Sequence, residues 1–162
     1  SLISNSPQQV KSFVTSLDQA IYKPVYGGAH TEMINESMLD LNRLEKTLAI
    51  SPVTIQEYVK GTNIRSYVIG DKIFSAELRS ESVDFREDHS TELIPLELPE
   101  TVTQWAFKVK KAFGLEWTAI DWRRNKQGDY YFLEANPSPM FLHFEKQTNM
   151  PITQSLVDLL NM

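Results

Sequence analysis

The sequence predicts an α+β fold, built either as one compact domain or as two closely packed subdomains. The chain has 162 residues, of which 41% are hydrophobic, enough for an ordinary buried core. Segments with apolar residues at helical spacing are separated by runs rich in β-branched and aromatic residues, which are typical of strands. This mixture of the two patterns is the basis for the predicted fold class.

The sequence of the first part of the chain predicts two helices and one short strand. The helix over Ser4–Asp18 has Asn5 or Ser6 as a candidate N-cap, with a proline next in the chain, where the first helical turn tolerates it. A strand over Ala20–Pro24 follows, and the spacing of leucines predicts a second helix over Met38–Ala49.

The sequence of the middle of the chain predicts a group of strands and a further helix. The strand-like runs are Val53–Val59, Ile64–Ile69 and Lys72–Leu78. Gly70 and Asp71 form a hairpin turn between the last two runs. The polar and acidic stretch Ser80–Leu98 is expected to be a long loop, and Pro99–Phe113 a helix that ends at Gly114. A last helix is predicted over Ile152–Leu160, after a stretch that is irregular or partly helical.

A hairpin formed by Trp117–Arg123 and Tyr130–Ala135 is expected to carry the functional residues. If the chain turns between Gln127 and Gly128, Asp121 lies opposite Glu134, and Asn136 shares their face because side chains alternate along a strand. Two carboxylates and an amide oxygen suit a hard cation such as Mg²⁺. The same pattern also fits an ordinary solvated hairpin face, and the spacing alone leaves both interpretations open.

Two further features have both a functional and a plain structural interpretation. Lys23, in an apolar strand before Gly27 and Gly28, fits a phosphate site, but a lysine at a strand edge before a turn is also common. Arg79 and Arg86 could bind anionic groups through their planar guanidinium, or form surface ion pairs with neighbouring acidic residues.

Composition excludes several classes of protein. A net charge of −5 and a pI of about 5.2 argue against non-specific nucleic-acid binding, which requires clustered Lys and Arg. No apolar run approaches the length of a membrane span, and we expect no signal peptide. The absence of cysteine rules out disulfides and thiolate metal sites and fits a cytoplasmic protein.

Several short motifs, taken in order, resemble the ATP-grasp superfamily over nearly the whole chain. Within it, the sequence is most similar to the ligases that modify ribosomal peptides, the microviridin or graspetide maturases, with the ribosomal-protein glutamate ligases as close relatives. The stretches that carry this resemblance are Lys23, Gln56–Val59, Asn63–Arg65, VDFR over Val83–Arg86, Asp121, Glu134–Pro137 and TNMPI after it.

The resemblance implies an ATP-grasp fold of two α+β subdomains, residues 1–57 and 58–162, with the nucleotide site between them. Lys23 matches the lysine that contacts the nucleotide phosphates. The adenine-binding segment corresponds to Gln56, Glu57, Tyr58 and Val59, with Glu57 and Val59 as the leading candidates. The Mg²⁺ ligands correspond to Asp121, Glu134 and Asn136. Arg65 and Arg79 match basic groups near the γ-phosphate or acyl phosphate, and Arg123 is another candidate.

The implied reaction is an ATP-dependent ligation with ATP and Mg²⁺ as cofactors and a peptide or other carboxylate as substrate. The alternatives are a catalytically incomplete MgATP-binding module and a structural α+β domain. Homodimers are common among such ligases. The chain begins at Ser1, and we expect the α/β domain that precedes this region in such ligases to be missing. Ser138 and Pro139 depart from the family, which often has a second Asn and a Gly there.

Overall fold

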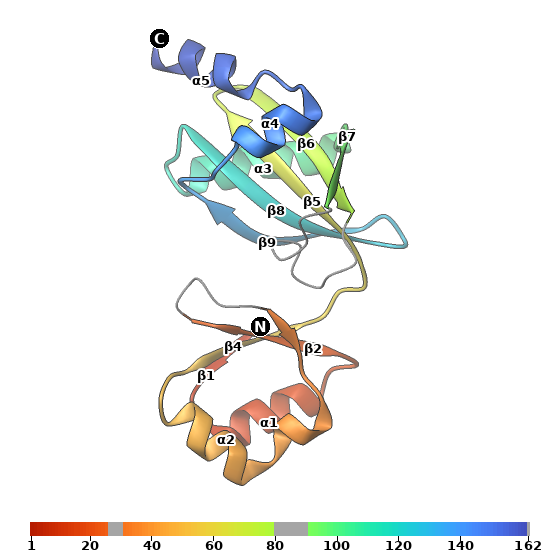
Figure 1. The fold of residues 1–162 in the computed structure, drawn as a ribbon, viewed down its shortest axis with the longest axis vertical. Coiled ribbons are helices and arrows are strands. Elements are labelled where there is room, and N and C mark those ends of the chain that lie inside the picture. The colour runs from red at the N-terminus through yellow and green to blue at the C-terminus, as the bar shows by residue number, and fades with distance from the viewer. Residues whose placement is uncertain (26–30, 80–90, 162) are drawn as a thin grey trace. The chain divides into compact units, whose positions relative to one another are not determined.

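The computed structural model describes residues 1–25, 31–79 and 91–161 (Figure 1). Within these ranges the chain forms two compact units, divided between Tyr58 and Val59, one residue beyond the expected subdomain boundary. The glycine pair Gly27–Gly28 and the stretch Val83–Arg86, with its candidate arginine, lie outside the described residues.

The first unit has a four-stranded sheet in the order β1-β4-β2-β3 with two helices packed on one face (Figure 1). Its elements are β1 (Leu2–Ser4), α1 (Pro7–Thr15), β2 (Ala20–Pro24), β3 (Glu32–Met33), a 3₁₀ turn η1 (Glu36–Leu39), α2 (Leu41–Leu48) and β4 (Val53–Glu57). The Ser6 side chain accepts a hydrogen bond from the Gln9 backbone, as expected of an N-cap. Val10 and Leu44 pack from the helices onto Ile55 of β4, which forms the core of this unit.

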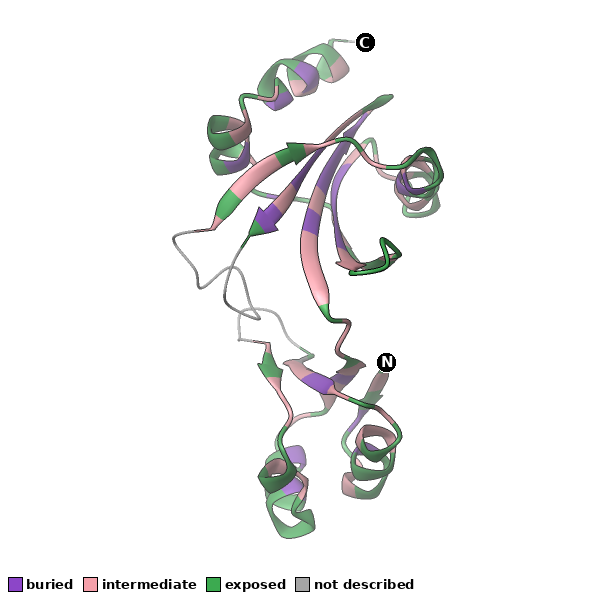
Figure 2. Ribbon diagram, turned by 90° about the vertical axis from the view of Figure 1, so that its right-hand side faces the viewer, coloured by how far each residue is buried: buried purple, intermediate pink, exposed green. Residues whose placement is uncertain are grey.

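The second unit has a five-stranded antiparallel sheet in the order β7-β6-β5-β8-β9. Its elements are β5 (Gly61–Ile69), β6 (Lys72–Arg79), β7 (Glu92–Leu96), α3 (Glu100–Ala112), β8 (Trp117–Asn125), β9 (Tyr130–Asn136), α4 (Leu142–Thr148) and α5 (Ile152–Leu160). Helix α3 covers one face, where Ala106 packs with Ile64 and Ile120. Helices α4 and α5 pack on part of the other face, around Tyr67 and Phe144 (Figure 2). The rest of that second face carries polar side chains.

Strand β7 corrects the expectation that residues 80–98 form one long loop. Residues 92–96 pair with β6 at the edge of the sheet, and Pro95 lies opposite Ala76. Proline lacks an N–H donor, so a strand that contains it is tolerated at a sheet edge. The first predicted helix is also too long, because residues 2–4 pair with β4 as β1 and the helix begins only at Pro7.

In the β8–β9 hairpin Asp121 pairs with Glu134 as predicted, but the turn position differs from the prediction and β9 contains a bulge. Arg124 pairs with Tyr130, which centres the turn on Gln127 rather than between Gln127 and Gly128. Continued without interruption, this register would place Leu133 opposite Asp121. Instead β9 contains a bulge at which Leu133 is the extra residue, and Glu134 pairs with Asp121. The pairing prediction is therefore confirmed, whereas the predicted turn position is wrong.

Gly61 at the start of β5 allows a close approach to the backbone of β8. A Cβ atom there would lie 1.9 Å from the backbone oxygen of Arg124, which cannot move without disturbing β8. We therefore expect Gly61→Ala to lower the free energy of unfolding by about 3 kcal/mol, measured by urea denaturation. Gly128→Ala is the matched control: its φ of +90° is unfavourable, but no atom lies within 4 Å, so a cost of about 1 kcal/mol is expected. Equal costs would contradict this account.

Candidate metal and phosphate site

Two cross-strand rows of side chains form the candidate site on the face of the second sheet opposite α3. The first row runs from Arg65 on β5 to Asp121 on β8 and Glu134 on β9. The second row, one pair further along, runs from Tyr67 to Ala119 and Asn136. We call the oxygen-bearing side chains of Asp121, Glu134 and Asn136 the acidic platform.

The bulge determines which side chains of β9 belong to this face. Tyr131 pairs with Arg123 on the platform side, so without the bulge strict alternation would turn Glu134 and Asn136 toward α3. The extra residue Leu133 shifts the alternation by one, and both side chains then face the platform side.

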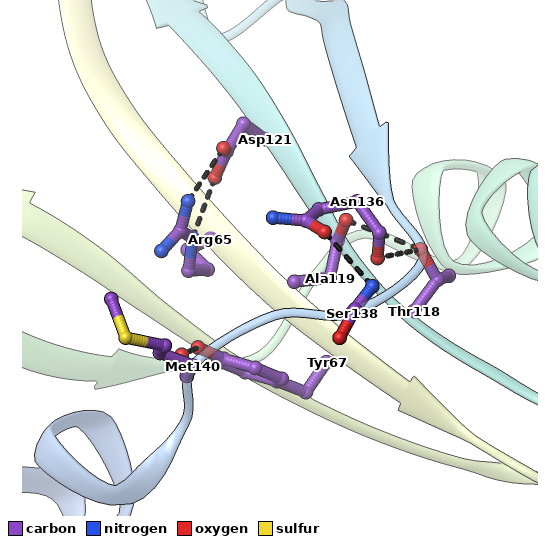
Figure 3. A network of polar contacts seen from close by, with 8 residues as sticks. All are labelled: Arg65, Tyr67, Thr118, Ala119, Asp121, Asn136, Ser138 and Met140. Carbon is purple, nitrogen blue, oxygen red and sulfur yellow. Dashed lines mark hydrogen bonds and ion pairs between the residues drawn. The ribbon is translucent and has the colours of Figure 1, made fainter. Parts of the chain in front are cut away.

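Asp121 is joined to Arg65 by a bidentate ion pair (Figure 3). Arg65 donates from Nε to Oδ1 at 2.8 Å and from Nη2 to Oδ2 at 2.7 Å. The Asp121 residue is only 8% exposed. Burial acts to lower the pKa of the Arg65 guanidinium, but the hydrogen bonds and charge of Asp121 outweigh it and raise that pKa above its ordinary value. Arg65 therefore stays charged and fixes the orientation of the carboxylate.

The platform has the donor chemistry that Mg²⁺ requires. All its ligating atoms are oxygens, the ligands preferred by hard cations. A carboxylate has about four lone-pair sites, so Asp121 can accept from Arg65 and still coordinate a metal. Glu134 is exposed and has no hydrogen-bond partner among the described residues, and the Asn136 amide oxygen accepts one hydrogen bond, from the Ser138 N–H at 2.9 Å. In the described part of the chain, no group of three or more His, Cys, Asp and Glu side chains is placed to hold a metal ion, so a metal site on the platform depends on the Asn136 amide oxygen as a third ligand.

Arg123 lies on the same face and binds the segment that opens the second unit. Its Nε donates to the backbone oxygen of Val59 at 2.8 Å, and its Nη1 donates to the Asn63 side chain at 2.8 Å. The Val59 carbonyl belongs to the segment expected to bind adenine. Arg123 thus ties that segment to the strand that carries Asp121.

Arg79 lies on the opposite face of the sheet from the platform. It follows Glu77 by two residues, and Glu77 pairs with Ile64 on the α3 side. Arg79 donates to Glu77 at 3.1 Å, and Arg124 binds the other oxygen of the same carboxylate. These contacts match the surface ion-pair interpretation. The structure does not bring Arg79 together with Arg65 and Asp121.

The residues expected to bind the nucleotide in the first unit lie on β2, β4 and the segment after β4. Lys23 pairs with Thr54 and Gln56 pairs with Ile21, so both side chains occupy the face of the sheet away from the helices. Glu57 points to the other face of β4 and is exposed. The Tyr58 N–H donates to the Gln19 carbonyl at 2.9 Å, which holds the end of this segment.

Removing Arg65 should leave the Asp121 carboxylate without its partner in a site largely shielded from water. We expect Arg65→Ala to lower the free energy of unfolding by about 3 kcal/mol, measured by urea denaturation. Adding Asp121→Ala to this variant should restore part of the loss, because it removes the unpaired charge. The control is Arg79→Ala, whose side chain is 60% exposed, with an expected cost below about 1 kcal/mol. A loss for Arg65→Ala no larger than that of the control would refute this account.

Comparison with known proteins identifies the family of the chain. The family model described as a RimK-like ATP-grasp domain matches residues 1–160. A probable alpha-L-glutamate ligase from Histophilus somni is 34% identical over 119 residues, which cover 68% of this chain and 39% of that protein.

Two solved ligase structures are also similar. The ATP-grasp ligase PsnB, in complex with a phosphomimetic variant of a minimal precursor, Mg and ADP, is 33% identical, with a TM-score of 0.89 over 99% of this chain and 51% of PsnB. The macrocyclase MdnC from Microcystis aeruginosa, bound with the precursor peptide MdnA, is 30% identical, with a TM-score of 0.85 over 99% of this chain and 55% of MdnC.

The chain therefore spans about two fifths of the glutamate ligase and about half of each solved ligase. None of the helices in the described ranges has the length and apolarity needed to cross a membrane. The family match extends through both units, from β1 to the end of α5. The chain belongs to the RimK-like ATP-grasp family.

Proposed function

We propose that this chain provides the MgATP-binding and catalytic part of an ATP-dependent carboxylate ligase. The observation that carries the proposal is the acidic platform, where a bulge turns Glu134 and Asn136 to the face of Asp121. Bound Mg²⁺ would supply charge neutralisation and orientation of the phosphate oxygens. In this proposal Asp121, Glu134 and Asn136 hold the cation.

The remaining residues are assigned by their chemistry and position. Lys23, with its ammonium on the helix-free face of the first sheet, is assigned to the nucleotide phosphates. The segment of Gln56, Glu57, Tyr58 and Val59 is assigned to adenine. The Val59 carbonyl already accepts from Arg123, so we assign adenine recognition chiefly to the other groups of the segment. Arg65 is assigned to the reacting phosphoryl group, because it shares the face of the platform.

The proposed reaction needs no covalent enzyme nucleophile. The substrate carboxylate oxygen attacks the γ-phosphorus of ATP, the bond to the bridging oxygen breaks, and ADP leaves. An amine or a hydroxyl then attacks the acyl phosphate carbon, loses its proton and releases inorganic phosphate. The product is an amide or an ester. Catalysis depends on positioning and on stabilisation of charge on the transferring phosphoryl group.

We propose a peptide as the carboxylate-bearing substrate. The support is that PsnB and MdnC were solved with precursor peptides and resemble this chain over 99% of its length. The ATP requirement and the absence of cysteine favour a cytoplasmic location. A homodimer is the assembly proposed by analogy with such ligases.

A second candidate function is MgATP binding without ligation. The observation that favours it concerns Arg79, one of the two basic residues expected near the reacting phosphate. Its guanidinium binds Glu77 on the α3 side of the sheet, away from Asp121. In this alternative the platform binds the nucleotide, and the chain acts in assembly or regulation.

Binding of MgATP is expected to stabilise the chain through the platform. At about 100 times its Kd, MgATP should raise the melting temperature by about 5–10 °C, measured by differential scanning calorimetry. Glu134→Ala should abolish this rise without destabilising the free protein, because Glu134 is exposed and has no partner in the described part of the chain. Glu116→Ala, which removes another exposed carboxylate of the same unit, serves as the control and should keep the rise. A rise retained in Glu134→Ala would refute the metal assignment.

Ligation and simple nucleotide binding differ in their dependence on a carboxylate substrate. The ligase proposal predicts that inorganic phosphate release from ATP increases at least tenfold when an acidic peptide is added, measured by a phosphate-release assay. Amidation of the peptide carboxylates removes the attacking group and should return release to the basal rate. If MgATP stabilises the protein but no peptide carboxylate stimulates release, the binding-module alternative is correct.

A further inference from the structure

The end of β9, where Asn136 lies, and the segment after it are held by three hydrogen bonds (Figure 3). Thr118 Oγ1 donates to the Asn136 backbone oxygen at 2.8 Å. The Ser138 N–H donates to the Asn136 side-chain oxygen at 2.9 Å. Tyr67 Oη donates to the Met140 backbone oxygen at 2.6 Å. Together they restrain the terminal residue of the strand and the segment that follows it.

The two side-chain donors are buried and rigidly placed. Tyr67 and Thr118 are both 0% exposed, so water cannot replace the partner of either hydroxyl without local opening. The Tyr67 ring packs edge-on against Phe144 of α4, with ring centroids 4.8 Å apart. Thr118 Oγ1 also lies 3.3 Å from the Ala119 backbone oxygen, and the Tyr67 hydroxyl also interacts with the Arg65 side chain. Buried hydroxyls held in such a network fix the positions of their partners as well as their own.

The sequence around Ser138 leaves one backbone donor for the Asn136 amide. Pro137 and Pro139 have no N–H, so Ser138 supplies the single backbone N–H between Asn136 and Met140. That N–H points at the Asn136 amide oxygen, which defines which end of the amide is the acceptor. The second lone pair of this oxygen stays available for a cation.

Tyr67 also connects the two cross-strand rows, because its hydroxyl interacts with the Arg65 side chain. Tyr67 is two residues beyond Arg65 on β5, and it occupies the row of Ala119 and Asn136. A metal ligand at the end of a strand is well oriented only if that end is fixed. Mutation of the groups that hydrogen-bond a metal ligand commonly weakens metal affinity by about 10- to 100-fold.

We propose that Tyr67 and Thr118 are positioning residues for Asn136, holding its amide oxygen on the face of Asp121 and Glu134 as a ligand of the divalent cation. The inference rests on the proposed function, because it takes the platform to be the cation site. It assigns a role to two buried hydroxyls, to Ser138 and to both prolines that follow Asn136.

The test uses Mn²⁺ as the probe, in the presence of ADP, with free Mn²⁺ counted by electron paramagnetic resonance. Tyr67→Phe and Thr118→Val each remove one hydroxyl while keeping the shape and burial of the side chain. Each should weaken Mn²⁺ binding about tenfold. ADP affinity without a divalent cation, measured by calorimetry, should stay unchanged in both variants.

The control variant is Ser75→Ala, which removes a buried hydroxyl on the α3 side of the same sheet. Ser75 donates to Ser66 at 2.9 Å, and Ser66 also accepts from the Trp122 indole. This variant should lower the melting temperature and leave Mn²⁺ affinity unchanged. If a general loss of stability were enough to weaken Mn²⁺ binding, Ser75→Ala would weaken it as Tyr67→Phe does.

A double-mutant cycle shows whether Tyr67 acts through Asn136. Asn136→Ala should weaken Mn²⁺ binding, and adding Tyr67→Phe to it should cause no further loss. Hydrogen exchange of the Ser138 amide should be faster in Tyr67→Phe and Thr118→Val than in the control variant.

The outcomes separate this inference from the proposed function. If the wild-type protein binds Mn²⁺ with ADP and Asn136→Ala weakens it, but Tyr67→Phe and Thr118→Val do not, the positioning role alone is overturned. Equal losses from Tyr67→Phe in the presence and absence of Asn136 overturn it as well. If the wild-type protein does not bind Mn²⁺ with ADP, the proposed function and this inference both fall.

Discussion

The extra residue at Leu133 is the constraint on which the candidate site depends. A three-residue turn centred on Gln127 sets one register for the β8–β9 hairpin, and that register alone would direct Glu134 and Asn136 into the α3 core. One unpaired residue reverses the alternation of β9 beyond it, so both side chains join Asp121. The same step leaves Ala135 among the apolar residues packed near α3. The bulge therefore places an apolar side chain in the core and polar side chains on the opposite face.

Charge on that face is balanced before any ligand is considered. The Arg65 guanidinium neutralises the nearly buried Asp121 carboxylate, while Glu134 stays exposed. Replacing both members of a buried ion pair by apolar residues of similar size costs little stability, whereas removing one member is costly; the pair as a whole makes the orientation of the carboxylate specific. Nearby, the buried hydroxyl of Thr118 holds the strand end that carries Asn136, and that of Tyr67 holds Met140 in the segment that follows. Preorganisation of Asp121 and Asn136 would reduce the entropy that the proposed platform loses on binding a cation.

The order of elements and the pairing of Asp121 with Glu134 could be predicted from the sequence because alternation and turn residues are local features. The bulge could not be predicted. Tyr131, Phe132 and Leu133 are all apolar or aromatic, so an extra residue among them does not interrupt any alternation of polar and apolar residues. Strand β7 was missed because Pro95 and its acidic neighbours are typical of a loop, and only its position at a sheet edge makes it compatible with a strand. The ion pair between Arg65 and Asp121 joins residues 56 positions apart, so no sequence spacing indicates it. In the sequence, Tyr67 and Thr118 are ordinary strand residues, because the Met140 and Asn136 oxygens that accept from their hydroxyls lie on other segments.

A crystal structure with Mn²⁺ and ADP, with the metal located by its anomalous scattering, tests the central claim most directly. The account predicts one anomalous peak at about 2.1 Å from oxygens of Asp121, Glu134 and Asn136, with phosphate oxygens as further ligands. ADP bound in the crystal with no peak at these three side chains, or with the metal held elsewhere on the chain, would contradict it.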